Sequence, residues 1–129
     1  MREIKFRAWD KENKIMQLPD ELKSQEVYLS FSGKPYLLNF PIHGKLGRCP
    51  YLEVMQFTGL KDKNGVLIYE GDIVKWWDNG NNDHVELISW GEAEWLCGKL
   101  AMNSLLFIDG TGNYCEVIGD IYENPELIK

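Results

Sequence analysis

Alternation between apolar and polar residues is the dominant pattern along the chain, and it predicts short strands in place of long helices. Residues 2–9 alternate in this way, and Lys5 and Arg7 fall on the polar face of the predicted strand. A polar stretch, residues 10–14, follows and leads to a second apolar run that starts at Ile15. The start of the chain is therefore predicted to be a hairpin.

The middle of the chain, QFTGLKDKNGVLIYEGDIVKW at residues 56–76, carries the clearest turn signals. Asn-Gly lies between two apolar runs there, which is typical of a tight hairpin whose two central residues accept positive φ. Gly-Asp-Ile follows and recurs 48 residues later, and in both places it predicts a turn that leads into a strand. We therefore expect structural turns at Asn64, Gly65, Gly71, Asp72, Gly119 and Asp120.

The remaining stretches divide into strands and loops. Three prolines and three glycines between residues 31 and 50 predict a long irregular excursion, while residues 19–25 allow a short helix at most. Residues 78–83 resemble a hairpin loop. Residues 91–102 fit a helix, with Ala93, Leu96 and Leu100 at helical spacing, or a strand; Gly98 interrupts the helical pattern, and we expect a strand. Pro125 is placed to begin a single helical turn.

Together these elements predict a mainly β fold with a single compact domain over residues 1–129. We expect an antiparallel, partly open barrel or two packed sheets, with one or two short helices; an α+β fold is the alternative. The predicted core consists of Ile4, Phe6, Val54, Phe57, Ile68, Ile73, Leu87, Phe107, Val117 and Ile121.

Charge is distributed unevenly along the 129 residues, whose formal net charge is −6. Residues 1–64 carry 11 Lys and Arg against 8 Asp and Glu, whereas residues 65–129 carry 3 against 12. The acidic second half argues against binding to a phosphate backbone there. No apolar run approaches the length of about 20 residues that crosses a bilayer, and we expect no membrane contact.

Three cysteines, Cys49, Cys97 and Cys115, form no C-x-x-C pair and are expected to be buried thiols in a reducing compartment. Neither metal-ligand spacing nor a nucleophile motif is present, so we expect no metal, no organic cofactor and no enzymatic activity.

Three blocks of the sequence resemble signature blocks of the YopX family, which occurs largely in phages and prophages of bacteria. They are FRAWDKENKIM near the start, QFTGLKDKNGVLIYEGDIVKW in the middle and EVIGDIYENPELI at the end. The resemblance implies a mainly β fold and a bacterial cytoplasm, but no reaction, because the family has no defined function.

Two surfaces are candidates for binding a partner. Trp76 and Trp77 are consecutive, so on a strand they face opposite sides and one of them must be covered by another layer or exposed. Trp9 lies in the first hairpin, where Lys5 and Arg7 could hold phosphates. We expect an accessory phage or prophage protein that acts through protein contacts as a homo-oligomer. The alternatives are a nucleic-acid binder that uses the basic hairpin, and an acidic nucleic-acid mimic that occupies a host protein.

Overall fold

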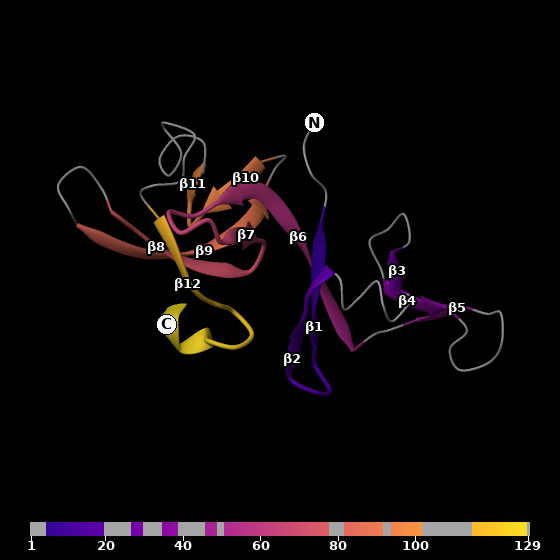
Figure 1. Cartoon of the computed structure of the whole chain (residues 1–129). Helices are drawn as coiled ribbons and strands as arrows, with labels where there is room; N and C mark the ends of the chain where they lie inside the picture. The colour runs from indigo at the N-terminus through magenta and orange to yellow at the C-terminus, as the bar shows by residue number, and fades with distance from the viewer. Residues whose placement is uncertain are drawn as a thin grey trace. The chain divides into compact units, whose positions relative to one another are not determined.

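A computed structural model of the chain describes residues 5–19, 27–29, 35–38, 46–48, 51–77, 82–91, 94–101 and 115–128. These residues form twelve strands and one 3-10 turn (Figure 1), so the predicted mainly β, antiparallel fold is confirmed. The chain divides into two compact units, residues 4–56 and residues 57–129 together with 1–3, each of which is described by itself. The single domain over 1–129 stays a prediction.

The unit of residues 4–56 begins with the expected hairpin. Strands β1 (Phe6–Asp10) and β2 (Ile15–Gln17) pair antiparallel, and β1 also pairs with the first half of β6 (Leu52–Lys61). Ala8 and Leu52 are buried between these strands, with Tyr51 and Val54 packed against them. Four consecutive residues of β1, 7–10, are buried, so both faces of this strand are covered and the polar face expected at Arg7 is not exposed.

The predicted irregular excursion at residues 31–50 is wrong for the part that the structure describes. Strands β3 (Val27–Leu29), β4 (Pro35–Leu38) and β5 (Leu46–Arg48) form a three-stranded antiparallel sheet with β4 in the centre (Figure 1). Pro35 is compatible with a central strand because it stands at the first residue, where a missing N–H interrupts no ladder further along. The short helix expected at 19–25 lies almost wholly outside the described residues.

The unit of residues 57–129 contains the strands β7 (Leu67–Tyr69), β8 (Asp72–Trp77), β9 (Asp83–Gly91), β10 (Glu94–Cys97), β11 (Leu100–Ala101) and β12 (Cys115–Asp120), and the 3-10 turn η1 (Pro125–Ile128). Five of these strands form an antiparallel sheet with the order β11-β10-β9-β8-β12. The second half of β6 pairs antiparallel with β7. The strand expected over residues 91–102 is confirmed as β10 and β11, and so is the single helical turn at Pro125.

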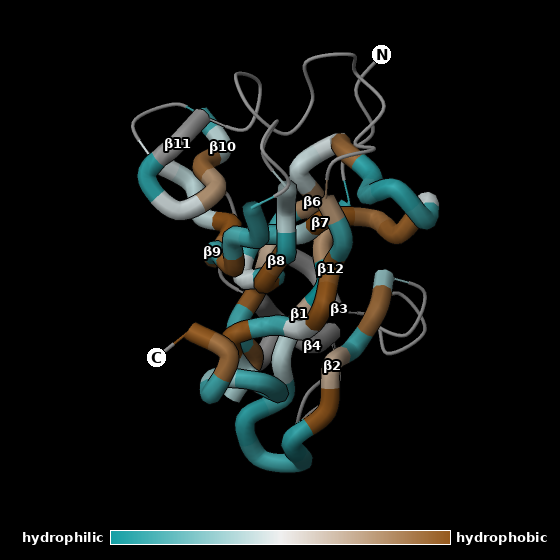
Figure 2. The backbone as a smooth tube through the Cα atoms, turned by 90° about the vertical axis from the view of Figure 1, so that its left-hand side faces the viewer, coloured by the Kyte–Doolittle hydropathy of each residue, from teal (hydrophilic) through white to brown (hydrophobic). Residues whose placement is uncertain are grey.

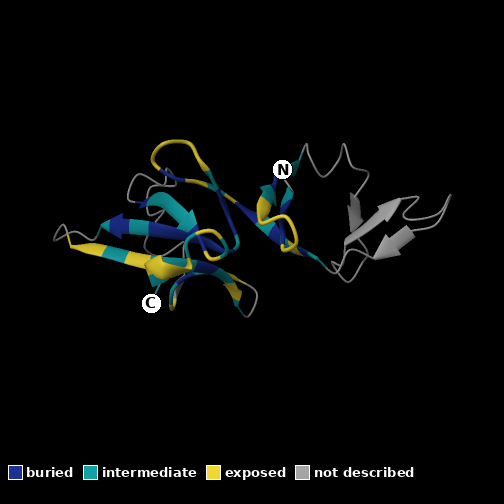
Figure 3. Ribbon diagram, turned by 90° about the horizontal axis from the view of Figure 1, so that it is seen from below, coloured by how far each residue is buried: buried dark blue, intermediate teal, exposed yellow. Residues whose placement is uncertain are grey.

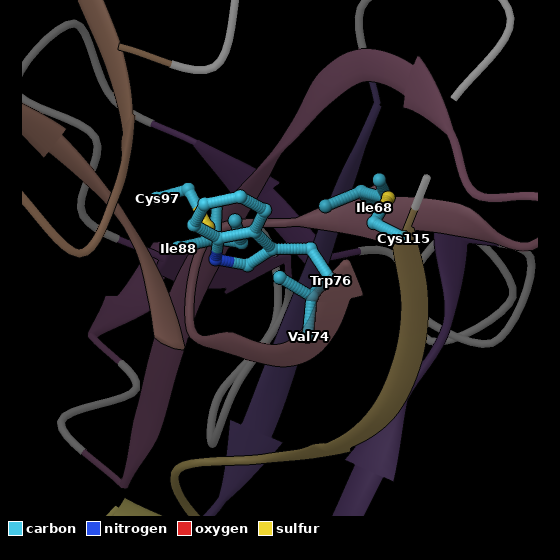
Figure 4. Close-up of a cluster of buried hydrophobic side chains, with 6 residues drawn as sticks. All are labelled: Ile68, Val74, Trp76, Ile88, Cys97 and Cys115. Atoms are coloured by element: carbon cyan, nitrogen blue, oxygen red, sulfur yellow. The ribbon is translucent and has the colours of Figure 1, made fainter. Parts of the chain in front are cut away.

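The core of this unit is assembled from five strands that are distant in sequence (Figure 4). Figure 4 shows the Trp76 ring beside Ile88 and Cys97, while Ile68 lies beside Cys115. The buried cluster consists of Ile68, Val74, Trp76, Ile88, Cys97 and Cys115, with Leu60, Trp95 and Val117 packed against it. Burial of these side chains is the main source of stability for the sheet.

Most of the predicted core residues that the structure describes are buried or half-buried, but Ile121 is exposed. Phe57, Ile68 and Ile73 are buried, and Phe6, Val54, Leu87 and Val117 are half-buried. Ile121 is 37% exposed, because it follows β12 in a turn, where strand alternation no longer applies. Ile4 and Phe107 lie outside the described residues.

Candidate functional site

The tryptophans named as partner contacts differ in their exposure. Trp9 and Trp76 are each only 7% exposed and belong to the interiors of their units, whereas Trp77 is half-buried. This is the arrangement that consecutive strand positions require, because Trp76 faces the core and Trp77 the opposite side of β8. The ring of Trp76 also stacks on His84 of the adjacent strand, with 4.2 Å between centroids. Of the three, Trp77 offers a partner the most surface, and its contact role stays a prediction.

Two lysines cover the ring of Trp77. Lys63 Nζ lies 4.4 Å from the ring centroid and Lys75 Nζ lies 5.9 Å from it, within the range of cation–π attraction. Each ammonium group also forms an ion pair, Lys63 with Glu116 at 3.6 Å and Lys75 with Asp83 at 3.2 Å. The charge around Trp77 is therefore largely balanced within the chain.

The basic residues of the first hairpin are not presented together. Arg7 is buried, and its Nη2 lies 3.7 Å from the sulfur of Met55, while Lys5 is half-buried. Lys11 is exposed and pairs with Glu53 at 2.9 Å, and Lys14 is exposed in the turn. The cations that remain accessible thus lie at the tip of the hairpin rather than along the strand that carries Lys5 and Arg7.

The two Gly-Asp-Ile segments lie next to each other, which the sequence did not indicate. Asp72 of β8 is the register partner of Asp120 in β12, and Ile121 N donates to the carbonyl of Gly71 at 2.9 Å. Gly71 has a φ of +87°, as the turn prediction required. Gly119 has no positive φ; it follows a register shift in β12, and a Cβ there would meet the side chain of Asn124. The two glycines therefore have different structural roles.

The turn at Asn64 and Gly65 exists, but its geometry differs from the two-residue hairpin that we predicted. Only Gly65 has a positive φ, +81°. The loop is longer because Asp62 organises it: its Oδ1 accepts hydrogen bonds from the backbone N–H groups of Asn64 and Val66. Its Oδ2 accepts another, from Val117 N of β12 at 2.9 Å. Sequence reasoning missed Asp62, although an Asp two residues before Asn-Gly is a recognisable turn former.

Buried aspartates hold other turns in the same way. Asp10 Oδ1 accepts from the N–H groups of Glu12 and Asn13, and Asp120 Oδ1 accepts from those of Tyr122 and Glu123. Burial raises the pKa of Asp10, but the hydrogen bonds from Asn13 and Glu12 outweigh it and hold that pKa below its ordinary value of 3.8. The backbone hydrogen bonds that these carboxylates accept offset the desolvation cost of burying them.

Burial also sets the chemistry of the two described cysteines. Desolvation raises the pKa of Cys97 from 9.0 to about 12, and the charge of Glu86 adds to the effect. The pKa of Cys115 is likewise raised to about 12 by burial, with a contribution from Asp62. Both thiols are therefore protonated and inert near neutral pH, as expected for buried thiols, and Cys49 lies outside the described residues.

A groove of about 430 Å³ lies between β9 and the C-terminal turn η1. Its apolar lining is Val85 and Leu87 from β9 and Leu127 and Ile128 from η1; Glu86, Ser89 and Gly98 complete it. Figure 3 shows exposed and half-buried positions along β9. The sequence analysis missed this groove, because its walls are separated by about 40 residues and only folding brings them together.

No three His, Cys, Asp or Glu side chains among the residues that the structure describes are grouped so that they could hold a metal ion. No helix in the described ranges is long and apolar enough to cross a membrane.

The fold and these surfaces define a mainly antiparallel β protein with turn-organising aspartates and a surface groove of mixed polar and apolar lining. The chain belongs to the YopX protein family, whose model matches residues 5–129, and the resemblance noted above is thereby confirmed. It is similar to the crystal structure of protein EF1440 from Enterococcus faecalis, with a TM-score of 0.64 and 27% identity over 100% of both chains. It is also similar in fold to YopX from Bacillus subtilis, with a TM-score of 0.57 and 20% identity over 100% of both chains. No curated protein matches the chain.

Proposed function

We propose that this chain is a non-enzymatic accessory protein of a phage or prophage, which works in the bacterial cytoplasm through contacts with other proteins and forms a homo-oligomer. The observation that carries the proposal is the set of large apolar side chains that the fold leaves exposed in both units. They are Ile15, Leu18, Val66, Val85, Trp90, Ile121 and Leu127. Val85 and Leu127 of this set line the β9–η1 groove, and exposed apolar residues that lie together are typical of protein contact surfaces.

The charge of the two units supports the same proposal. Residues 4–56 carry 8 Lys and Arg against 6 Asp and Glu, a net charge of +2, whereas the other unit carries 6 against 14, a net charge of −8. The charge asymmetry along the sequence therefore coincides with two compact bodies. Opposite net charges on separate bodies favour oriented association between copies.

Nucleic-acid binding through the first hairpin has less support. That hypothesis needs Arg7 and Trp9 at the surface, and both are buried. Accessible cations remain at Lys11 and Lys14, but Lys11 is already paired with Glu53.

The test is the solution mass by light scattering over a tenfold range of protein concentration, at low salt and at about 0.5 M salt. We expect a mass above that of one chain, 15.0 kDa, that rises with concentration and falls with salt. A strict monomer under every condition would contradict the homo-oligomer. Titration of the same protein with single-stranded and duplex DNA should show no salt-dependent binding, and clear binding would favour the nucleic-acid alternative.

A further inference from the structure

We propose that the β9–η1 groove is a docking site for one extended segment of a partner protein, which adds to the sheet as a further strand beside the first half of β9. The inference rests on the proposed function, since it names a surface and a kind of partner for the protein contacts. The whole site lies within the unit of residues 57–129.

The first half of β9 is an open edge of the sheet. On one side, β8 pairs with β9 over residues 83–87. On the other side, β10 pairs only with residues 88–91, and next to this pairing Gly98 N donates to the carbonyl of Leu87 at 2.9 Å. Among the residues that the structure describes, no strand lies on the β10 side of residues 83–86. Such an edge is a template on which another extended chain can pair.

The backbone groups of Val85 point to this open side. The carbonyl of Leu87 faces Gly98, whereas the carbonyl of Ile88 accepts from the N–H of Gly71, which precedes β8, at 2.9 Å. Successive residues of an antiparallel strand direct their N–H and C=O groups to alternate sides. Val85, two residues before Leu87, therefore directs both of its groups to the side that β10 leaves open. The edge thus offers one donor and one acceptor at its centre.

The lining of the groove shows that it runs along this edge. Three consecutive residues of β9, Val85, Glu86 and Leu87, line it, although neighbouring side chains of a strand point to opposite faces of the sheet. A cavity on one face would contact alternate residues, whereas a cavity at the edge contacts all three and the backbone between them. A lining of mixed polar and apolar character is what such an edge presents.

The groove also offers contacts to the side chains of an added strand. Val85 and Leu127 are 41% and 38% exposed, and Leu87 and Ile128 are half-buried. η1 contacts β9, and Figure 2 shows apolar colour at the end of η1 near the C-terminus. The volume of about 430 Å³ suits a few side chains. An added strand places every second side chain on the face of Val85 and Leu87, so a segment with apolar residues at alternate positions fits best.

Backbone complementarity, rather than charge, selects the occupant. Glu86 and Glu126 are acidic, but Lys99 is exposed in the adjacent β10–β11 turn, and Lys75 is paired with Asp83 at 3.2 Å, so both signs of charge surround the groove. A groove with η1 as one wall admits a single extended segment. A second copy that offered its own β9 edge would bring its own η1 to the same place, which favours a linear segment of another protein.

Hydrogen exchange of the free protein, followed by NMR, tests the edge itself. After correction for intrinsic rates, the Val85 amide should exchange at least about tenfold faster than the Glu86 amide, because the N–H of Glu86 points toward β8. Equal protection of the two amides would mean that this edge is already covered, and would overturn the proposal.

The binding test uses the full-length protein and a phage-displayed library of random 12-residue peptides. We expect enriched peptides with apolar residues at alternate positions, and the synthetic form of the most enriched peptide should slow exchange of the Val85 amide. Val85→Pro removes the outward N–H and leaves the groups that face β8 intact, which an edge strand tolerates, and should weaken peptide binding at least about tenfold. Val85→Thr keeps the N–H and the branched shape, so it is the matched control and should bind within about threefold of the parent. Circular dichroism establishes that each variant is folded.

The proposal would be overturned if the library yielded no binding peptide, or if the parent and Val85→Pro bound the enriched peptide equally. If Val85→Pro does not fold, the parent decides: a bound peptide that leaves the Val85 amide unprotected binds elsewhere and contradicts the proposal. An oligomeric parent that Val85→Pro converts to a monomer would show that a second copy occupies the edge instead of a foreign segment.

The proposed function fails by a different result. A monomeric parent whose Val85 amide is protected by the peptide would overturn the homo-oligomer and leave the docking site standing. An oligomeric parent that binds no peptide would support the homo-oligomer and overturn the docking site.

Discussion

Single aspartates determine much of this structure, because their side chains replace water at backbone N–H groups that strands leave unpaired. Asp62 is the clearest case, since it is 3% exposed and accepts three backbone hydrogen bonds, two within its own turn and one from Val117. The last of these bonds lies at the edge of the five-stranded sheet, where β12 would otherwise expose a donor to another chain. One carboxylate thus builds a turn and closes a sheet edge.

Asp62→Ala should lower the free energy of unfolding by about 1–3 kcal/mol, because three donors lose their acceptor and the Val117 N–H is left at a half-buried position. Urea denaturation measures this change. Asp83→Ala, which removes a carboxylate of 54% side-chain exposure, is the control and should cost under about 1 kcal/mol. Equal losses in the two variants would mean that the hydrogen bonds of Asp62 contribute little.

Because the thiols of Cys97 and Cys115 are buried, we expect them to react slowly with thiol reagents and to make the stability of the protein fall at high pH. In a Cys49→Ser variant, a thiol reagent at pH 8 should react far more slowly with the native protein than with the protein in denaturant. A thiol with a pKa of about 12 is ionised on the order of one part in ten thousand at that pH. Rapid modification of the native protein would contradict the burial of Cys97 and Cys115.

The sign of the pH dependence follows from the raised pKa values. Below pH 9.0, the ordinary thiol pKa, both thiols are protonated in the folded and unfolded chains, and their contribution to stability is fully present. Above pH 9.0 the unfolded thiols ionise while the folded ones stay protonated, so stability falls and this contribution is lost as the pH approaches 12. Replacing Cys97 and Cys115 by Ala should flatten the fall of stability between pH 9 and pH 11, measured by denaturation.

At the scale of elements, the two Gly-Asp-Ile segments show how the same short motif serves two purposes. Gly71 joins β7 to β8 with a positive φ, and its N–H also donates to the carbonyl of Ile88 at 2.9 Å. Gly119 instead lies in β12 beside the side chain of Asn124, whose Oδ1 accepts from Asp120 N. The repeat in the sequence predicted a turn that leads into a strand at both positions. The pairing of β8 with β12 decides the structural role of each glycine.

Gly71→Val should destabilise the protein by roughly 1 to 3 kcal/mol, because a β-branched side chain at positive φ is strained. Gly65→Ala provides the comparison: its φ is also positive, but a Cβ there meets nothing within 4 Å, so its smaller cost measures backbone strain alone. Thermal unfolding of both variants, together with light scattering, separates stability from association. Unchanged stability with lost association would mean that Gly71 belongs to a binding surface instead of a structural turn.

At the scale of the whole molecule, β6 is the element that the two units share. Residues 52–56 of β6 pair with β1, and its residues 57 and 61 are register partners of β7, so one continuous strand contributes to both units. Fraying β6 would therefore remove hydrogen bonds from each unit at once. This continuity supports the prediction of a single domain over residues 1–129.

If that prediction is right, urea unfolding should be a single transition with the same midpoint for both units. Tryptophan fluorescence distinguishes them, because Trp9 reports on residues 4–56 and the other four tryptophans report on residues 57–129. A Trp9→Phe variant, whose fluorescence comes from residues 57–129 alone, should give the same unfolding curve by fluorescence as by circular dichroism, which reports on both units. Two separate midpoints would show that the units unfold as independent domains.

Local patterns along the chain determined the elements of this protein, since alternation and turn chemistry act over a few residues. They predicted the first hairpin, the strand that follows Gly71, a strand over residues 91–102, the turn at Gly71 and the helical turn at Pro125, all of which the structure contains. Local turn rules also predicted too simple a loop at Asn64. The carboxylate of the nearby Asp62 accepts a hydrogen bond from Val117 N, which is 55 residues away in the sequence.

Tertiary structure alone decided which side chains are accessible, because exposure depends on what packs from elsewhere in the chain. Trp76 is buried by residues of β7, β9, β10 and β12, and Trp9 is buried as well, while Trp90, which the sequence did not single out, is 50% exposed. The β9–η1 groove has the same origin, since Val85 and Leu127 become neighbours only when η1 packs beside β9. A residue's type and local periodicity describe one strand, whereas a binding surface is made where several strands and turns meet.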